Sequence, residues 1–310
     1  MYVLLVCIQT LVSAALALGG SSTFEYAILP VSVAIYMGTG RTRGALGLIA
    51  AAAAGPAIVR AQGLLAAYYA VVAALGIVIG VGAQRRWTYG RIVALCAGAA
   101  YSIALVAALA TWQDWVAEGV RVHAEWMALF QRSARVPDEV AEQIREQLSW
   151  LLLDHWSDLG LGLMFGSTAT MVCIGVSWAS HRLRRRCAAP APKGGFRDMR
   201  TPDWLIWAAI AIALAWFVDR HRPDMGLRPF VWNAAVGLGA VYWLNGMSIV
   251  VFAAGLLGSP VGYVVAVAAG LLACGVYVPF FVGLFDTWAD FRRRLAAWRT
   301  AGPDTSGPPS

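Results

Sequence analysis

Residues Leu64–Ala83 read LLAAYYAVVAALGIVIGVGA, and Gln84, Arg85 and Arg86 follow them directly. The run contains no charged residue and has about the 20-residue length that an α-helix needs to cross a hydrocarbon core of about 30 Å. The arginines after it lie in a short loop, where basic residues are typically retained on the cytoplasmic side of a membrane. The stretch therefore predicts a spanning helix followed by an inward-facing loop.

The composition of the whole chain supports the same interpretation. Of 310 residues, 59% are hydrophobic and 13% are charged, whereas soluble domains carry about 25% charged residues. We therefore expect the lipid bilayer to be the chief partner of this chain. The net charge of +7 comes from arginines in loops rather than from a basic stripe with exposed aromatic residues, so we predict no nucleic-acid binding.

Further apolar runs repeat along the sequence. The long ones are Tyr2–Leu18, Ile92–Trp112, Leu159–Ala179, Phe230–Leu257 and Val261–Leu284. The shorter ones are Phe24–Met37, Ala45–Val59 and Trp204–Val218, with Pro30 in the first and Pro56 in the second. We predict an all-α fold, a polytopic transmembrane helix bundle of about eight or nine spans with an extracytoplasmic helical hairpin.

The arginine-bearing loops predict the orientation. Residues 39–44, 84–91 and 182–203 carry half of the 24 lysine and arginine residues, and all three loops lie inside if the N-terminus is cytoplasmic. This predicts a multi-pass protein of the bacterial inner membrane. The run Trp204–Val218 would rise only about 22 Å. An interfacial position for it gives eight spans and a cytoplasmic C-terminus, while a spanning position gives nine.

We divide the chain into six predicted regions. They are a five-span core at 1–112, an acidic extracytoplasmic helical hairpin at 113–157, a sixth span at 158–181, a basic cytoplasmic linker at 182–203, C-terminal helices at 204–299 that end in an interfacial amphipathic helix, and a disordered tail at 300–310.

Polar residues inside apolar runs are the candidates for a ligand site, because they are costly in a membrane. They are Gln9, Tyr68, Tyr69, Asn233 and Asn245, together with Glu25 at a helix edge and the helix break at Pro30. For Gln9, Asn233 and Asn245 we favour hydrogen bonds between helices. A ligand role for Asn245 stays open.

The segment GLFDTWADFRRR at Gly283–Arg294 closes the apolar part of the chain. We expect one helix here, with an i, i+4 pair between Asp290 and Arg294 and an apolar stripe that includes Trp288 and Phe291. Such a helix lies at the membrane interface and is anchored to anionic lipid by Arg292, Arg293 and Arg294. A catalytic role for Asp286 is not required.

The chain contains no nucleotide-binding, nucleophile-elbow or zincin motif. We therefore predict that it is not an enzyme and has no catalytic residue and no cofactor. The five cysteines form no C-x-x-C pair, and Asp154, His155 and Asp158 lack enough further ligands for a metal site.

Several stretches carry a resemblance to a known family. They are Leu29-Pro30, Arg41-x-Arg43-Gly44, Gly76-x-x-x-Gly80 before Arg85-Arg86, Asp203-Trp204, LNGMSIVV at Leu244–Val251 and the ending Gly283–Arg294. Together they resemble the YybS-like family of uncharacterised bacterial membrane proteins. The resemblance implies an N-terminal core similar to the substrate-binding components of energy-coupling-factor vitamin transporters and to the cell-shape protein MreD. It implies no catalytic or ligand residue.

Two hypotheses of function follow. The first is a transport-associated membrane component that binds a small molecule and works with other membrane subunits, since short proline-broken helices often line transporter sites. The second is a non-catalytic membrane scaffold that recruits envelope or cytoplasmic partners. A co-purifying ligand with a polar pocket near Pro30 and Pro56 favours the first, and a solidly packed bundle with binding confined to the hairpin or the linker favours the second.

Overall fold

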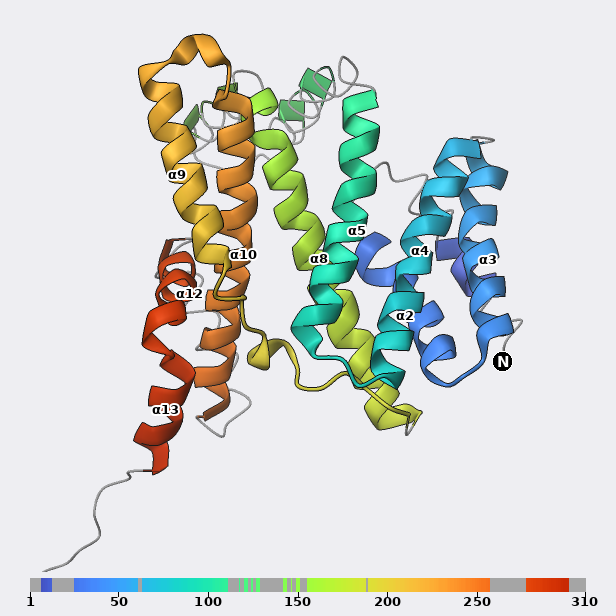
Figure 1. Ribbon diagram of the computed structural model, residues 1–310. Helices are drawn as coiled ribbons and strands as arrows, with labels where there is room; N and C mark the ends of the chain where they lie inside the picture. Colours follow the sequence, from blue (N-terminus) through green and yellow to red (C-terminus); the bar gives the residue numbers. More distant parts are fainter. Residues whose placement is uncertain are drawn as a thin grey trace, which may run out of the picture. The chain divides into compact units, whose positions relative to one another are not determined.

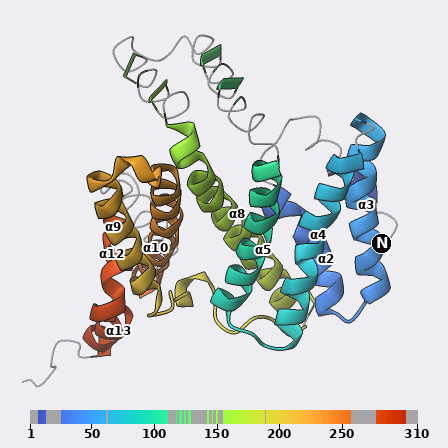
Figure 2. The same ribbon diagram turned by 45° about the horizontal axis from the view of Figure 1, so that its top comes forward.

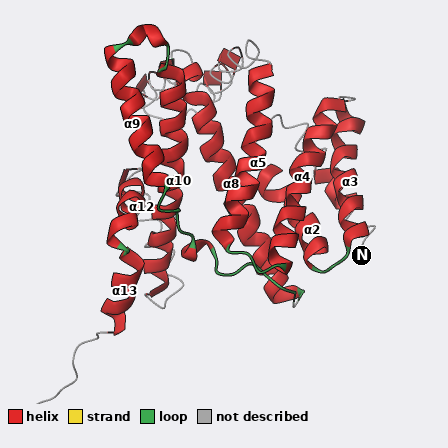
Figure 3. Cartoon of the chain, viewed as in Figure 1, coloured by secondary structure: helices red, strands yellow, loops and turns green. Residues whose placement is uncertain are grey.

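The computed structural model describes residues 7–12, 25–60, 63–110, 155–187, 189–256 and 277–300, with isolated positions between 117 and 150. Within these ranges the regular elements are helices, joined by loops and by one β-bridge between Thr88 and Lys193 (Figure 3). The predicted all-α class is confirmed. The predicted hairpin at 113–157 and the predicted tail lie almost wholly outside the described residues.

The chain divides into two compact units. The first comprises Met1–Ala97, Ala169–Asp203 and Ala240–Ser310, and the second comprises Gly98–Thr168 and Trp204–Gly239. Three helices, α5 (Tyr89–Ala110), α8 (Trp156–Arg186) and α10 (Arg228–Leu256), contribute residues to both units.

In the first unit, α2 (Glu25–Gly38), α3 (Thr42–Arg60) and α4 (Gly63–Gln84) pack side by side (Figure 1). Pro30 lies inside α2 and Pro56 inside α3. A proline in a helix lacks the N–H that would bond the carbonyl four residues earlier. Both helices nevertheless continue through their prolines, so the helix breaks expected at Pro30 and Pro56 are not found.

The contact between α2 and α4 is made by the Gly76-x-x-x-Gly80 pair. A Cβ on Gly76 would lie 2.7 Å from Cβ of Val33 and 2.9 Å from the Ala34 nitrogen, and one on Gly80 would lie 2.9 Å from the Ala34 oxygen. Only glycine permits this backbone approach. Gly76 comes before Gly80 in α4, and the residues of α2 that Gly76 contacts likewise come before most of those that Gly80 contacts. The two helices therefore run in the same direction. The pair therefore packs α4 against α2.

Glycines also bring α8 close to α2. A Cβ on Gly175 would lie 3.0 Å from the carbonyl oxygen of Ala27, and one on Gly38 would lie 2.7 Å from a methyl group of Leu183. The earlier part of α8 therefore faces the earlier part of α2, and the two helices are parallel. This agrees with the direction expected for the second, fourth and sixth spans of a chain that alternates across a membrane.

The linker after α8 folds onto the turn before α5. The helix continues to Arg186, five residues beyond the predicted end of the sixth span at 181. The amide of Lys193 donates to the carbonyl of Trp87 at 2.8 Å, and the amide of Tyr89 donates to the carbonyl of Lys193 at 3.0 Å. Arg184 donates to the carbonyls of Pro192 and Gly194. A short 3-10 helix, η2 (Phe196–Asp198), follows.

In the second unit, α9 (Leu205–His221) turns back into α10 through η3 (Pro223–Met225) and Gly226, whose φ is 62°. Figures 1 and 2 both show α9 beside the first part of α10. The run Trp204–Val218, which the sequence leaves interfacial or spanning, thus forms one uninterrupted helix. It has no buried residue, and Trp207, Leu214 and Phe217 are among its exposed side chains.

The C-terminal helices are α12 (Tyr277–Ala289) and α13 (Phe291–Thr300). The expected single helix through Gly283–Arg294 is wrong, because Asp290 has a φ of 42° and separates the two. The carboxylate of Asp290 lies 3.3 Å from Arg200 of the linker, which is not the Arg294 partner that the sequence predicts.

Two helices of the described chain, Asp158–Arg185 and Arg228–Leu256, are long and apolar enough to cross a membrane. Shorter apolar helices lie at Tyr26–Gly38, Thr42–Ile58 and Tyr68–Gln84. The predicted spans Tyr2–Leu18 and Val261–Leu284 fall mostly outside the described residues. The span count of eight or nine stays a prediction.

The close approach of α4 to α2 predicts the effect of a side chain at the contact. We expect Gly76→Leu to lower the free energy of unfolding by about 1–3 kcal/mol or more, because overpacking moves helix backbones apart. The measurement is the thermal unfolding midpoint of the purified protein in detergent. Gly98→Leu in α5 is the control, since a Cβ there meets no atom within 4 Å. Equal midpoints for the two variants would contradict the contact.

Candidate functional site

Gln9 joins the helical residues 7–12 to α2 one residue from the proline break. Its side chain is buried. Nε2 donates to the carbonyl of Leu29 at 3.2 Å, and Oε1 accepts a hydrogen bond from the Ser32 hydroxyl at 3.0 Å. Both polar ends of the amide are therefore used within the bundle, which is the interhelical role favoured from the sequence.

A pocket of about 400 Å³ lies beside this contact, within the first unit. It is lined by Ile8, Ile28, Val31, Ser32, Ile35, Tyr36, Trp178 and Arg182. Its long walls are one face of α2 and the face of α8 that carries Trp178 and Arg182. The transport hypothesis calls for a polar pocket near Pro30 and Pro56. This pocket lies near Pro30, with Ile28 and Val31 in its lining, but it is mainly apolar and no described residue of α3 is among those that line it.

The chemistry of the pocket is strongly asymmetric. Its walls are almost entirely aliphatic or aromatic, and Arg182 is the one charged residue among the described residues that line it. The Ser32 hydroxyl already donates to Gln9. Such a pocket suits a ligand with an apolar body and an anionic group, since the apolar walls hold the body and the guanidinium binds an anion.

The tyrosine candidates form an aromatic cluster between α2 and α4. The hydroxyl of Tyr68 donates to that of Tyr26 at 2.8 Å. The rings of Tyr68 and Tyr69 meet edge to face with centroids 5.7 Å apart. Tyr26 and Tyr69 are buried, so the cluster packs the two helices together. Glu25 begins α2, and its side chain lies outside the described residues.

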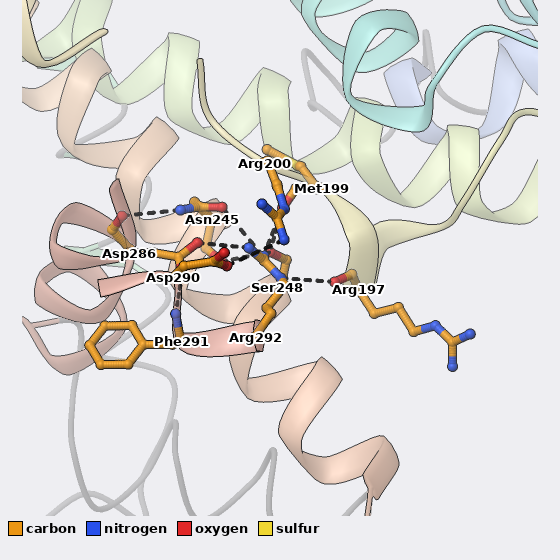
Figure 4. A network of polar contacts seen from close by, with 10 residues as sticks. Arg197, Met199, Arg200, Asn245, Ser248, Asp286, Asp290, Phe291 and Arg292 are labelled. Carbon is orange, nitrogen blue, oxygen red and sulfur yellow. Dashed lines mark hydrogen bonds and ion pairs between the residues drawn. The ribbon is translucent and has the colours of Figure 1, made fainter. Parts of the chain in front are cut away.

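A second polar site surrounds Arg292, whose side chain is 5% exposed. Nη1 lies 2.7 Å from Oδ2 of Asp286, which is itself 9% exposed. Nη2 donates to the carbonyl of Met199 at 2.7 Å, and Nε donates to the carbonyl of Arg197 at 3.2 Å (Figure 4). The guanidinium thus binds one carboxylate and two linker carbonyls.

Two side chains of α10 complete this Arg292 site. Nη2 of Arg292 donates to the Ser248 hydroxyl, and Oδ1 of Asn245 lies 3.4 Å from the same nitrogen. The amide of Asn245 also donates to the carbonyl of Gly283 at 3.0 Å. Asn245 therefore links α10 to α12, and its polar atoms are used within the protein. This supports the interhelical interpretation of Asn245 over the ligand role.

Burial lowers the pKa of Arg292, while the adjacent Asp286 carboxylate acts to raise it. Arginine remains protonated in proteins, so the buried charge has to be compensated by its neighbours. Asp286 provides the countercharge, and its other oxygen accepts the amide of Phe291 at 2.9 Å, at the first residue of α13. The site therefore fixes both the linker and the start of the last helix.

The predicted lipid anchor needs a correction at Arg292. An anchoring arginine has to reach lipid headgroups, whereas Arg292 is enclosed by protein. Arg293 and Arg294, which follow it, are exposed, and Trp288 is 62% exposed. These three residues are exposed, which an interfacial anchor requires, and Phe291 is half-buried. Their contact with lipid stays a prediction.

Asn233 connects α10 to α8 within the second unit. Its Oδ1 accepts the amide of Gly162 at 2.8 Å, and its Nδ2 donates to the carbonyl of Pro229 at 2.9 Å. Nearby, Asp158 forms a 3.0 Å ion pair with Arg228. Among the described residues no cluster of three potential ligands could hold a metal ion.

Three residues that line the pocket or contact Arg292 are missed by sequence reasoning. Arg182 looks like one of several linker arginines, and only the continuation of α8 to Arg186 places it on the pocket face. Trp178 lies one helical turn earlier on that face, inside an apolar run that gives it no distinguishing signal. Ser248 lies in the quoted LNGMSIVV stretch, whose polar spacing Asn245-x-x-Ser248 is a signal for a polar contact on one helix face.

A family model described as "Predicted membrane protein (DUF2232)" matches residues 6–287, which is nearly the whole chain. No curated protein and no solved structure matches the chain.

The Arg292 site predicts unequal effects of neighbouring substitutions. We expect Asp286→Ala to cost about 3–5 kcal/mol of stability, because it leaves a buried charge without its partner. Replacing both residues, as in Asp286→Ala with Arg292→Met, is expected to cost less than Asp286→Ala alone. Arg293→Ala is the matched control and should change stability by less than about 0.5 kcal/mol. Thermal unfolding in detergent distinguishes these outcomes, and a double variant worse than Asp286→Ala would contradict the pairing.

Proposed function

The chain belongs to the DUF2232 family of predicted membrane proteins, and on this premise we propose that it is a transport-associated membrane component that binds a small molecule. The observation that supports the proposal is the pocket of about 400 Å³ between α2 and α8, beside the proline inside α2. The proposed role is non-enzymatic, and energy for transport would come from separate membrane subunits.

The arrangement around the pocket supports binding rather than mere packing. A helix that contains a proline is tolerated at membrane depth where other protein segments or a cavity surround it. Helix α2 has both kinds of neighbour, since protein packs against it and the pocket lies beside it. On one flank its backbone contacts α4 at Gly76 and Gly80. On the other, the close approaches of α8 are near Gly175 and Leu183. The pocket lies on this second flank, where residues of α2 and α8 line it together with Ile8.

The sequence resemblance adds to this proposal. The N-terminal part of the chain resembles the core of energy-coupling-factor substrate-binding components, which are integral membrane proteins that bind a small molecule and rely on partner subunits. The position of the pocket in the first unit, along α2, is compatible with such a role.

A non-catalytic scaffold is the second candidate, and the folded linker favours it. Arg292 donates hydrogen bonds to the linker carbonyls of Arg197 and Met199. The amide of Lys193, also in the linker, donates to the carbonyl of Trp87. The side chains of Arg197 and Arg200 are nevertheless 65% and 61% exposed. A basic segment that is fixed in position and exposed is suited to binding an acidic partner protein.

The experiment that separates these functions is affinity purification from native membranes in mild detergent, followed by mass spectrometry of the recovered proteins. The transport proposal predicts a transmembrane coupling subunit and ATPases among them. Recovery of envelope-assembly proteins without an energising subunit would overturn it and favour the scaffold. A variant with Arg197→Ala and Arg200→Ala serves as a control, because it should abolish scaffold partners and leave a coupling subunit bound.

We also propose a multi-pass topology in the bacterial inner membrane, with the N-terminus, the linker and the C-terminus in the cytoplasm. The contact of Arg292 with Met199 supports the same side for the last two. In a variant without native cysteines, Arg197→Cys and Arg294→Cys are expected to react with an impermeant maleimide in inside-out vesicles and not in intact spheroplasts. Labelling of the two positions from opposite sides would contradict the topology.

A further inference from the structure

The pocket is a groove that runs beside the contact between α2 and α8. The two helices approach each other closely where Gly175 lies near Ala27 and where Leu183 lies near Gly38, and the lining residues of α2 fall between these two positions in the sequence. Between them, from Ile28 to Tyr36, α2 rises about 12 Å. The groove therefore has the form of a slot along the helix axes rather than a round cavity.

The groove is accessible from the side of the bundle. Ile8 and Trp178, which flank it, are 45% and 41% exposed. Along α2, Ile28 and Ile35 lie two turns apart on one face and are half-buried. In a membrane protein such side chains meet lipid acyl chains. A flexible hydrocarbon chain is thus the body that fits this slot.

Arg182 provides the specific polar group at one end of the groove. It is half-buried, and the described part of the chain supplies it with no ion pair or hydrogen bond. Arg184, two residues on, is instead bound to the carbonyls of Pro192 and Gly194. A partly buried guanidinium without a protein partner is completed by an anion, and phosphate matches its geometry.

We propose that the groove between α2 and α8 binds an anionic phospholipid. One acyl chain lies along Ile28, Val31 and Ile35, and the headgroup phosphate lies against Arg182. The phosphate end is the end of α8 that leads into the basic linker, where anionic lipids concentrate if the linker is cytoplasmic. This inference rests on the proposed small-molecule-binding role and names the class of ligand.

The test is native mass spectrometry of the full chain in detergent, titrated with phosphatidylglycerol and, separately, with phosphatidylcholine of the same acyl chains. The wild-type protein is expected to bind the anionic lipid more tightly. Arg182→Gln should weaken phosphatidylglycerol binding about tenfold, and Arg182→Lys should retain most of it. The matched control is Arg185→Gln, which removes the same charge from an exposed position of α8. Equal losses for Arg182→Gln and Arg185→Gln would overturn the proposal.

A second variant tests the groove rather than the charge. Ile35→Trp fills the slot and is expected to abolish the high-affinity lipid adduct, while Ile58→Trp, at a position of α3 that is 76% exposed, should leave it unchanged. If Ile35→Trp removes a bound molecule that is not a phospholipid, the ligand class is wrong and the proposed function stands. If the wild-type groove holds no molecule and Ile35→Trp changes nothing, both proposals fail.

Discussion

Direct contact between helix backbones is the interaction on which the first unit depends. Lipid tails are as apolar as the side chains they would replace, so helices in a bilayer associate through close packing rather than through the hydrophobic effect. Here α2 touches α4 at Gly76 and Gly80, and it touches α8 at Gly175. With its backbone supported on two sides, α2 accommodates Pro30, and the groove lies beside the contact with α8.

The buried Arg292 follows a different principle. Removing a guanidinium from water is costly unless a countercharge and enough acceptors surround it. Asp286 gives the countercharge, and the surrounding groups come from three parts of the chain that are distant in sequence: the linker, α10 and α12. The charge is satisfied only when all three are in place. It therefore specifies one path for the linker, which has few apolar residues of its own to fix that path.

Sequence periodicity predicts the helices because an apolar run has few alternatives in a membrane, and the spacing of Gly76 and Gly80 predicts their contact. Sequence periodicity gives the wrong prediction at Arg292 because the apolar stripe predicted through Gly283–Arg294 requires one continuous helix. The break depends on the backbone of Asp290, a non-glycine residue with positive φ. The acceptor carbonyl of Met199 has no sequence signal either, since every residue has a carbonyl. The position of Arg182 beside the pocket cannot be predicted from the sequence, because it depends on how far α8 continues.

The linker is attached at two points that lie six residues apart, at Lys193 to the turn before α5 and at Met199 to the guanidinium of α13. A fully extended chain of six residues reaches about 20 Å, and this stretch is shorter than that limit because it includes the 3-10 helix η2. The linker therefore acts as a tether with an upper limit on its length. A displacement of the last two helices beyond that limit would pull on the α4–α5 turn, which couples two parts of the first unit through the backbone itself.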